Sequence, residues 1–405
     1  MTFRVAISGL SAAQAELSTT ANNIANSSTT GFKASRVQFG ELYSASAQGE
    51  GAFAVGSGVK VTGVSQQFNQ GAINFTDNGL DLAISGSGFF VLGSDSGRVY
   101  SRAGSFKVDR DGYVVNNGGL RLQVFPPVSG GGFNTGATAD LRLQSGESAP
   151  AATNRVGVTF NLPGNASVPP STPFDPANPD TYNYSTAMTV YDSLGAAHTA
   201  TVYFSKLAAD NTWEQRLYID GNAIGDAQTL EYSNTGALVA PANGEVTFPE
   251  YTTQTGAAPL QLDFDFRAST QYGTAFSVSA VEQDGYTTGR LIGVETQVDG
   301  VVQARFTNGR SVALGKVALA QFASLDGLQQ MADTTWSESF ASGPALLGEA
   351  GSGGAGVIQS GALESANVEV TEQLVNMITA QRNFQANAKM ISTADAISQT
   401  VINIR

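Results

Sequence analysis

Cysteine is absent from this chain of 405 residues, and histidine occurs once, at His198. Without cysteine the chain can form neither a disulfide nor a thiolate metal site, and one histidine is too few for a histidine-rich metal site. A serine–histidine–aspartate catalytic site would have to use His198. We therefore expect no metal and no other cofactor.

Long apolar runs and positive charge are also scarce. The sequence has no uninterrupted run of about 18 apolar residues, the length that a membrane-spanning helix needs. Residues 1–17 contain a single arginine and lack a compact apolar core, so we expect no cleavable signal peptide. Acidic residues outnumber basic ones by 34 to 21, and the resulting net charge of −13 predicts neither a nucleic-acid partner nor an anionic membrane surface.

The remaining composition indicates folded β structure around an acidic centre. Hydrophobic residues make up 41% and charged residues 14% of the chain, which is apolar enough for packed cores and too weakly charged for disorder. The block 145–284 holds ten of the 13 prolines, together with 15 acids and 4 bases. The block therefore carries a net charge of −11, which is most of the −13 of the whole chain, and this indicates a separate central domain.

The first residues have the spacing of a helix that packs along one face. Large apolar residues recur every seven positions and small ones lie between them, which is typical of a coiled-coil seam. The polar residues from Asn22 to Ser28, followed by Gly31, end this helix. The residues that we predict to mediate self-assembly on it are Phe3, Ala6, Leu10, Ala13, Leu17 and Ile24.

The last 40 residues repeat this pattern. A second seam for self-assembly consists of Val370, Leu374, Met377, Phe384, Ala388 and Ile391. A helix on its own leaves its apolar seam exposed to water. The two helices therefore pack either on each other alone or also on copies from neighbouring subunits, and the second possibility is the more specific hypothesis. Neutral amides flank the seam, and we expect them either to face a channel or to form interhelical hydrogen bonds: Gln373, Asn376, Asn383 and Asn387.

The chain between the two helices has the pattern of short strands. Residues 80–92, 98–116 and 120–125 are typical of short strands joined by glycine and Asp-Gly turns. Residues 187–204 predict a hairpin with its turn at 193–197. The glycine-rich stretch 348–361 has the composition of a linker.

Motifs that could carry chemistry are weak. His198 lies near Asp192 and Ser193, but all three share one predicted turn and no Gly-x-Ser-x-Gly elbow accompanies them. The Gly-x-Gly-x-x-Gly pattern that begins at Gly351 lies among other glycines, where no strand-to-helix turn is predicted. The Asp-x-Asp-Gly pattern that begins at Asp109 lacks the closing acids of a calcium loop. We therefore expect a structural or interaction protein and not an enzyme.

Both ends of the chain resemble a known family. TTANNIANSSTTGFKASRVQF (19–39) and SGALESANVEVTEQLVNMITAQRNFQANAKMISTADAI (360–397) are similar to the N-terminal and C-terminal signatures of the bacterial flagellar rod and hook proteins. GLDLAISGSGFFVL (79–92) and YSRAGSFKVDRDGYVVN (100–116) resemble the β domain that this family shares. The motif residues carried over from the family are Asn22, Asn23, Asn26, Gly31 and Phe32.

The resemblance implies a mainly β fold with α-helical termini. Coiled-coil terminal helices would form an inner core, with two outer β domains of which the outermost is inserted into the other. We expect terminal helices in 1–30 and 362–405 and linkers in 31–70 and 348–361. We expect a discontinuous β domain in 71–144 and 285–347, and an inserted acidic β domain in 145–284.

The same resemblance implies a function. Residues 172–204 resemble the outer domain of the hook members of the family, which have the plan of a rod protein with a large insertion. The chain is then a subunit of a curved, flexible tube with a central export channel, which joins the flagellar motor to the filament. A distal rod-type protein is the alternative. A carbohydrate-active enzyme or adhesin built on the acidic block is a third, less favoured hypothesis.

The partners implied by the resemblance are other parts of the flagellum. They are further copies of the chain in a helical homopolymer, the rod, hook-cap and hook–filament junction proteins, and the flagellar type III export apparatus. We expect no nucleic acid and no small-molecule substrate. The expected location is the extracellular hook, reached by export without a cleaved signal peptide.

Overall fold

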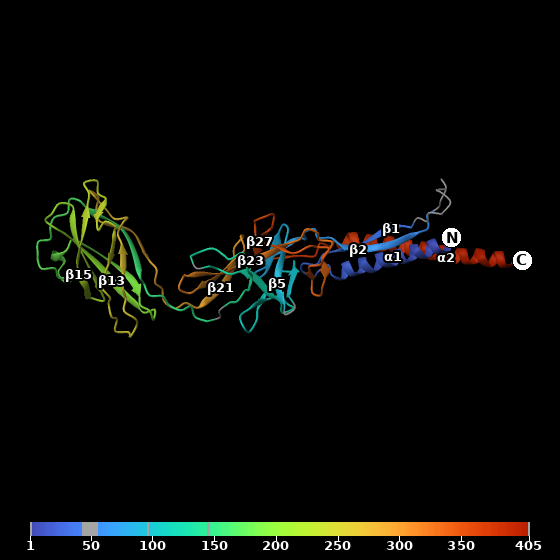
Figure 1. Cartoon of the computed structure of the whole chain (residues 1–405), viewed down its shortest axis with the longest axis horizontal. Coiled ribbons are helices and arrows are strands. Elements are labelled where there is room, and N and C mark those ends of the chain that lie inside the picture. The colour runs from blue at the N-terminus through green and yellow to red at the C-terminus, as the bar shows by residue number, and fades with distance from the viewer. Residues whose placement is uncertain (1, 43–55, 95–96, 129, 144–145, 404–405) are drawn as a thin grey trace. The chain divides into compact units, whose positions relative to one another are not determined.

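The computed structural model describes residues 2–42, 56–94, 97–128, 130–143 and 146–403. The chain divides into two compact units. Unit 1 consists of Met1–Ser145, Gly293–Arg305 and Ser311–Arg405, and unit 2 of Gly146–Ile292 and Phe306–Arg310. Unit 2 is thus inserted in the sequence of unit 1 (Figure 1). None of the helices among the described residues is both long and apolar enough to cross a membrane.

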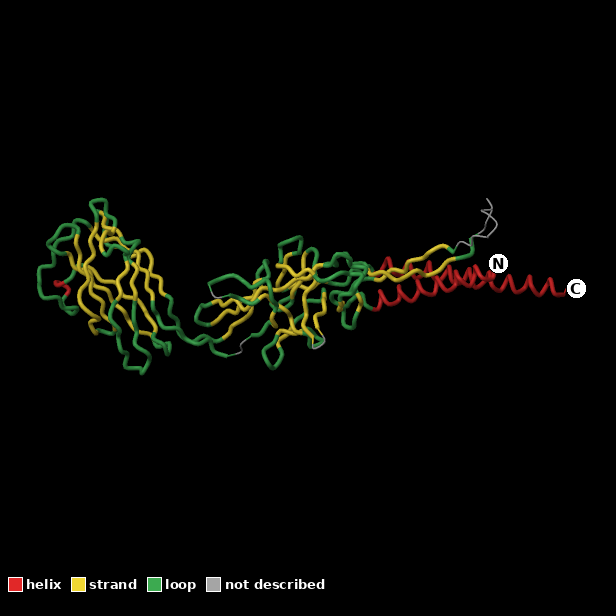
Figure 2. The backbone as a smooth tube through the Cα atoms, in the orientation of Figure 1, coloured by secondary structure: helices red, strands yellow, loops and turns green. Residues whose placement is uncertain are grey.

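Two long helices in unit 1 come from opposite ends of the chain. Helix α1 runs over Thr2–Ala25 and helix α2 over Val370–Asn403, and the two pack against each other. An antiparallel hairpin of β1 (Ser35–Glu41) and β2 (Val59–Gln66) packs on α1. Figure 2 shows these helices in red with the hairpin strands beside them.

The turn after α1 requires glycine. Gly31 has a φ of +69°, in the left-handed region that glycine adopts without strain. A Cβ atom at this position would lie 2.4 Å from the backbone nitrogen of Ala103, so the chain also approaches the β sheet too closely for any side chain. Gly31 therefore fixes the path of the chain as it leaves the helix.

A sheet of twelve strands forms the centre of unit 1. Phe89 and Val91 face one apolar core, while Phe90 and Leu92 face another, so the strand that contains them is buried on both sides. The twelve strands are β5 (Phe89–Ser94), β6 (Gly97–Ser101), β7 (Lys107–Val108), β8 (Val114–Val115), β9 (Arg121–Phe125), β10 (Ala139–Asp140), β21 (Leu291–Thr296), β22 (Val301–Phe306), β23 (Ser311–Gln321), β24 (Gln329–Gln330), β25 (Thr335–Ser337) and β26 (Leu346–Glu349).

Two short ladders connect the N-terminal and C-terminal parts of unit 1. Strand β3 (Ile73–Phe75) pairs with β28 (Ala362–Glu364), and β4 (Leu82–Ser85) pairs with β27 (Val357–Ser360). Both pairings are antiparallel. They hold the chain that leads into α2 against the chain that follows β2.

Unit 2 contains two five-stranded sheets around one apolar core. Strand β13 alternates buried and less buried residues along its length, as expected for a sheet that covers a core on one face. A short 3-10 helix, η1, spans Pro179–Thr181. The strands are β11 (Arg155–Pro163), β17 (Glu245–Thr247), β18 (Asp263–Asp265), β19 (Thr270–Tyr272) and β20 (Ser277–Gln283) in one sheet, and β12 (Tyr184–Tyr191), β13 (Ala197–Lys206), β14 (Thr212–Ile219), β15 (Asn222–Tyr232) and β16 (Leu238–Ala240) in the other.

The predicted fold class, mainly β with helical termini and more than one β domain, is confirmed. The two stretches that we expected to be linkers contain more structure than their composition indicates. Residues 31–70 include the β1–β2 hairpin, whose connection, 43–55, lies outside the described residues. Residues 348–361 include the end of β26 and all of β27, because the glycines there form the turn between these two strands.

Candidate assembly interface

Small residues bring the two terminal helices close together. Ala6 and Ala13 of α1 and Ala380 of α2 are buried at the contact. The larger predicted residues Leu10 and Leu17 are half-buried beside them. Ile24, Met377, Phe384, Ala388 and Ile391 are half-buried as well. These residues of the predicted seams therefore do meet a partner within one chain.

Three residues of the predicted seams are only partly covered within one chain. Phe3 is 48% exposed, Val370 is 42% exposed and Leu374 is 47% exposed. Phe3 lines a pocket together with Met390 and Ile397 of α2.

Exposed apolar residues on α2 occur in two separate pairs along the helix. Leu374 and Ile378 are one turn apart, and Ile378 is half exposed. Met390 and Ile397, seven residues apart, are exposed further along the helix. Exposed apolar residues arranged in this way mark an interaction surface that a second helix alone leaves open.

The neutral amides lie mostly between the helices. Asn23 Nδ2 donates a hydrogen bond of 3.2 Å to Gln373 Oε1. The Asn387 amide lies so close to Gly9 that a Cβ atom there would be 2.6 Å from Asn387 Oδ1. Asn376 is half-buried, whereas Asn383 is exposed. Within one chain, Gln373 accepts an interhelical hydrogen bond, whereas Asn387 Nδ2 donates to the Asn383 carbonyl oxygen of its own helix at 2.9 Å. The channel-lining hypothesis and its interhelical alternative both stay predictions.

The motif after α1 connects the helix to the hairpin. Asn23 is buried, and its side chain bonds both the N–H and the C=O of Ser35, at 2.9 and 2.8 Å. Phe32 is buried at the turn. Asn26 donates to the Asn22 carbonyl oxygen at 3.1 Å, which continues the last turn of the helix. Asn22 itself is exposed.

A buried ion cluster adjoins this motif, and the sequence analysis missed it. Lys33 Nζ lies 2.6 Å from Glu364 Oε1, and both side chains are fully buried. Arg102 Nη1 lies 3.5 Å from Glu364 Oε2. The pair joins the turn after α1 to β28, the strand before α2. Two cations share one carboxylate here, so the cluster carries a net charge of +1.

Each member of the ion cluster also has backbone partners. Lys33 Nζ donates to the Asn69 carbonyl oxygen at 2.7 Å, and Gly71 N–H donates to Glu364 Oε1 at 2.9 Å. Arg102 Nη2 donates to the Gly86 carbonyl oxygen at 2.7 Å. Burial lowers the pKa of Lys33, although the Glu364 carboxylate opposes the shift, and burial also lowers the pKa of Arg102.

Two further side chains hold the same junction. Asn367 Oδ1 accepts a hydrogen bond from Ala34 N–H at 2.7 Å, and Asn367 Nδ2 donates to the Gln67 carbonyl oxygen at 2.6 Å. Trp336 Nε1 donates to Gln66 Oε1 at 2.5 Å, which connects the hairpin to the sheet. The terminal helices and the β sheet of unit 1 are therefore joined by polar contacts that span most of the sequence.

The only histidine lies in unit 2, between two carboxylates. His198 Nδ1 is 2.5 Å from Asp220 Oδ2, and His198 Nε2 is 3.3 Å from Asp192 Oδ2. Burial disfavours charge on the ring, but the hydrogen bonds to Asp220 and Asp192 outweigh it, so the pKa of His198 is raised. With each ring nitrogen facing a carboxylate, neither nitrogen faces the Ser193 hydroxyl, which accepts from Ala258 N–H at 2.9 Å.

The other motifs have structural roles. Asp109 Oδ1 accepts hydrogen bonds from Asp111 N–H and Tyr113 N–H, as in a β-turn. Gly351 N–H donates to the Gly356 carbonyl oxygen, in the turn between β26 and β27. Among the described residues there is no group of three or more His, Cys, Asp or Glu side chains that could hold a metal ion.

Four family models match the chain. They are described as "Flagella basal body rod protein" over residues 3–33, "Flagellar hook protein FlgE/F/G D1 domain" over 83–165, "Flagellar basal body protein FlaE D2 domain" over 135–286, and "Flagellar basal body rod FlgEFG protein C-terminal" over 359–404. The flagellar hook protein FlgE of Escherichia coli (strain K12) is 39% identical over 419 residues, which cover 100% of both chains. This chain belongs to the flagellar hook protein FlgE family.

Other hook proteins are similar over nearly the same extent. The protein of Salmonella typhimurium (strain LT2) is 38% identical and that of Borreliella burgdorferi (strain B31) is 32% identical, with at least 98% of each chain covered. A crystal structure of Helicobacter pylori flagellar hook protein FlgE2 has a TM-score of 0.56 at 14% identity, and the match covers 72% of this chain and 100% of that one. The shared fold thus extends beyond recognisable sequence identity.

Membership of the hook family makes the chain a structural protein of the flagellum.

The matched terminal segments include both the motif from Asn22 to Phe32 and the position of Glu364. Of the two partners, only Lys33 stands out in the sequence. It is one of three charged residues in 3–33, whereas Glu364 is one of six in 359–404.

Proposed function

We propose that this chain is the subunit of the hook, a curved and flexible tube that transmits torque from the flagellar motor to the filament. The similarity to hook proteins over the whole chain carries this proposal. In the proposed tube the terminal helices form the inner core, and the β units lie outside it.

The helix surface supports self-assembly by helical repetition. Apolar residues on both helices, among them Phe3 and Leu374, stay exposed in the single chain. Two different surfaces that fit each other across neighbouring copies give an open, heterologous contact, which builds a filament and not a closed ring. The proposed partner of the exposed helix faces is thus a further copy of the same helices.

The proposal extends to the other partners. They are the rod, the hook-cap and hook–filament junction proteins and the flagellar type III export apparatus, which would deliver the chain unfolded and without a cleaved signal peptide. A chain without cysteine suits this route because no disulfide can form to trap it. The exposed amide of Asn383 is a candidate for the wall of the central channel.

We further propose that unit 2 folds independently, lies on the outside of the tube and adjusts its bending. Its charge is 15 acids against 6 bases, or −9. Like charges on adjacent copies disfavour tight fixed contacts, and salt screens them over about 8–10 Å. Such contacts would form and separate as the tube bends, while the helix core carries the torque.

A distal rod-type protein is the second candidate, because the descriptions of the family models that match the two termini name the basal body rod. The match of residues 135–286 to the D2 domain favours the hook, since that segment forms most of the insertion. No feature of unit 2 favours a carbohydrate-active enzyme or adhesin.

Electron microscopy of the purified full chain under polymerising conditions tests the main proposal. We expect short curved tubes. Straight tubes would favour the rod-type candidate, and a chain that stays monomeric under all conditions would contradict both.

The role of unit 2 is tested by replacing residues 145–284 with a short Gly/Ser linker. We expect tubes of smaller diameter with altered or lost curvature. If the remaining chain is folded but forms no tubes, the inserted block belongs to the assembly core and the proposed division is wrong.

A further inference from the structure

Asparagine followed by glycine occurs four times in the chain, at Asn78, Asn117, Asn243 and Asn308. In such a pair the backbone nitrogen of the glycine can attack the side-chain amide of the asparagine and form a five-membered ring, with loss of ammonia. Glycine favours this reaction because it has no Cβ atom to hinder its own nitrogen. The four sites share this chemistry, so their surroundings decide which of them reacts first.

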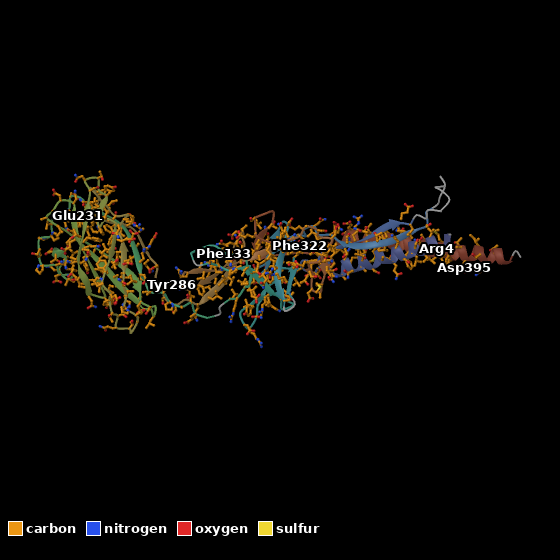
Figure 3. The ribbon with its side chains drawn as sticks, in the orientation of Figure 1. Arg4, Phe133, Glu231, Tyr286, Phe322 and Asp395 are labelled. Atoms are coloured by element: carbon orange, nitrogen blue, oxygen red, sulfur yellow. The ribbon has the colours of Figure 1, made fainter. Side chains whose placement is uncertain are left out.

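At Asn308, in unit 2, hydrogen bonds hold both groups that would react. Asn308 Nδ2 donates to the Thr287 carbonyl oxygen at 2.8 Å, and Asn308 Oδ1 accepts from a backbone N–H at 3.1 Å. Figure 3 labels Tyr286, the residue before Thr287. The N–H of Gly309, which contains the attacking nitrogen, donates to the Phe306 carbonyl oxygen at 3.0 Å. These bonds must break before the ring can form.

Asn78 and Asn243 are held in related ways. Asn78 Nδ2 donates to Asp81 Oδ1 at 3.0 Å, and Asn78 Oδ1 accepts from a backbone N–H at 3.2 Å. Asn243 Oδ1 accepts from a backbone N–H at 3.2 Å. The N–H of the glycine after Asn243 donates to the Pro241 carbonyl oxygen at 2.8 Å. Each of these two sites therefore also has to lose hydrogen bonds before it can react.

Asn117 differs from the other three asparagines. It is exposed in the turn between β8 and β9, which is closed by a hydrogen bond of 3.1 Å from Gly119 N–H to the Asn116 carbonyl oxygen. Among the described residues, neither the side-chain amide of Asn117 nor the N–H of Gly118 has a hydrogen-bond partner. Both groups that would react are therefore available without the loss of a hydrogen bond.

We propose that Asn117 is a site of spontaneous deamidation in this protein. Hydroxide takes the N–H proton of Gly118, and the nitrogen forms a bond to Asn117 Cγ. The bond from Cγ to Nδ2 then breaks, and Nδ2 leaves as ammonia with a proton from water, which regenerates hydroxide. A second water molecule opens the ring at either of its two carbonyl groups and yields aspartate or isoaspartate. Each event replaces a neutral amide by one negative charge.

The new charge arises next to an existing one. A Cβ atom at Gly118 would lie 3.3 Å from Asp333 Oδ2, so this carboxylate is close to the reacting backbone. Asn117 and Asp333 also line one pocket of about 300 Å³, together with Thr29 and Thr30 of the turn after α1. Deamidation therefore places a second carboxylate on the wall of this pocket, beside the chain that leads out of α1.

One timed incubation compares all four sites in the same sample. The purified, monomeric full chain is kept at mildly alkaline pH, and the extent of deamidation at each asparagine is measured by proteolysis and mass spectrometry. We expect Asn117 to react at least about fivefold faster than each of the others, which corresponds to about 1 kcal/mol for one hydrogen bond that need not break. In denaturant, where no fold protects any site, the four rates should lie close together.

Matched variants connect the charge change to this position. Asn117→Gln should suppress the acidic species that ion-exchange chromatography detects after incubation, because glutamine would have to form a larger ring. Asn243→Gln, at another exposed asparagine, should leave the acidic species unchanged. The proposal is overturned if Asn117 in the folded chain reacts no faster than Asn243 and Asn308, or if the same acidic species form in Asn117→Gln. Both measurements use the monomeric chain, so neither outcome depends on the proposed function.

Discussion

Glu364 supplies the negative charge of the buried cluster that joins the two ends of unit 1. The Glu364→Gln substitution preserves the shape of the side chain but removes the only negative charge in a buried cluster with Lys33 and Arg102. Removing one partner of a buried ion pair costs about 3–5 kcal/mol, because the remaining charge is left uncompensated. We expect the loss to lie near the lower end, because the glutamine oxygen can still accept hydrogen bonds from Lys33 Nζ and Gly71 N–H.

Tryptophan fluorescence can follow this effect in unit 1 alone. The chain has two tryptophans, of which Trp336 is buried in unit 1 and Trp213 is buried in unit 2. In a Trp213→Phe background, denaturant unfolding followed by Trp336 should show a loss of about 3 kcal/mol for Glu364→Gln. Unfolding of unit 2, followed by Trp213 in a Trp336→Phe background, should not change.

The control is Glu369→Gln, which removes an exposed carboxylate near the start of α2 and should cost less than about 0.5 kcal/mol. If Glu364→Gln also costs less than about 1 kcal/mol, the cluster is not a structural connection between the two ends of the chain. The reasoning from burial and charge would then be wrong.

Three further predictions concern other positions. His198→Gln should destabilise unit 2 by about 2 kcal/mol at pH 6, because it removes a charged hydrogen-bonded bridge between Asp192 and Asp220. Folding raises the pKa of His198, so this contribution is fully present below about pH 6.5 and is lost as the pH rises through the higher folded pKa. The free energies of unfolding of the wild type and the variant should therefore become equal at alkaline pH. Gln215→Leu should stabilise unit 2 by about 1–3 kcal/mol in thermal unfolding, because the amide of Gln215 is fully buried with no hydrogen-bond partner among the described residues. A loss of stability would show that the amide is hydrogen-bonded in solution. Phe384→Asp should abolish tube formation without changing the unfolding of unit 2, and normal tubes would contradict the placement of Phe384 at the helix contact.

Local patterns in the sequence predicted the elements whose cause is local. The seven-residue repeat predicted both terminal helices, and the two runs of strand-forming residues around 193–197 predicted the β12–β13 hairpin. The repeat was less informative about which face of α2 meets α1. The less exposed residues of α2 include Gln373, Ala380 and Asn387, because small residues and amides allow the two helices to approach closely. A search for large apolar residues selects Val370 and Leu374 instead.

The periodicity of the sequence could not predict contacts between residues that are far apart in the chain. The Lys33–Glu364 pair joins residues 331 positions apart, and neither residue belongs to an apolar repeat. His198 could be associated with Asp192 from the sequence, but its closer partner, Asp220, follows β14 and reaches the ring only through the pairing of β13 with β14. The β1–β2 hairpin was missed because its strands are separated by a long connection and not by a recognisable two-residue turn.

The buried cluster and the open helix surface have complementary consequences for assembly. At one end of the helix pair, Glu364 and Asn367 fix the chain before α2 to the turn after α1, so the two helices enter their contact with a set register. Toward the other end of the helix pair, Phe3, Met390 and Ile397 line one pocket and about half of each side chain is exposed. Because the register is set by buried polar contacts within the chain, the apolar residues are left free to bind other copies. A subunit built in this way presents the same helix surface each time it is added, which is the condition for a regular helical polymer.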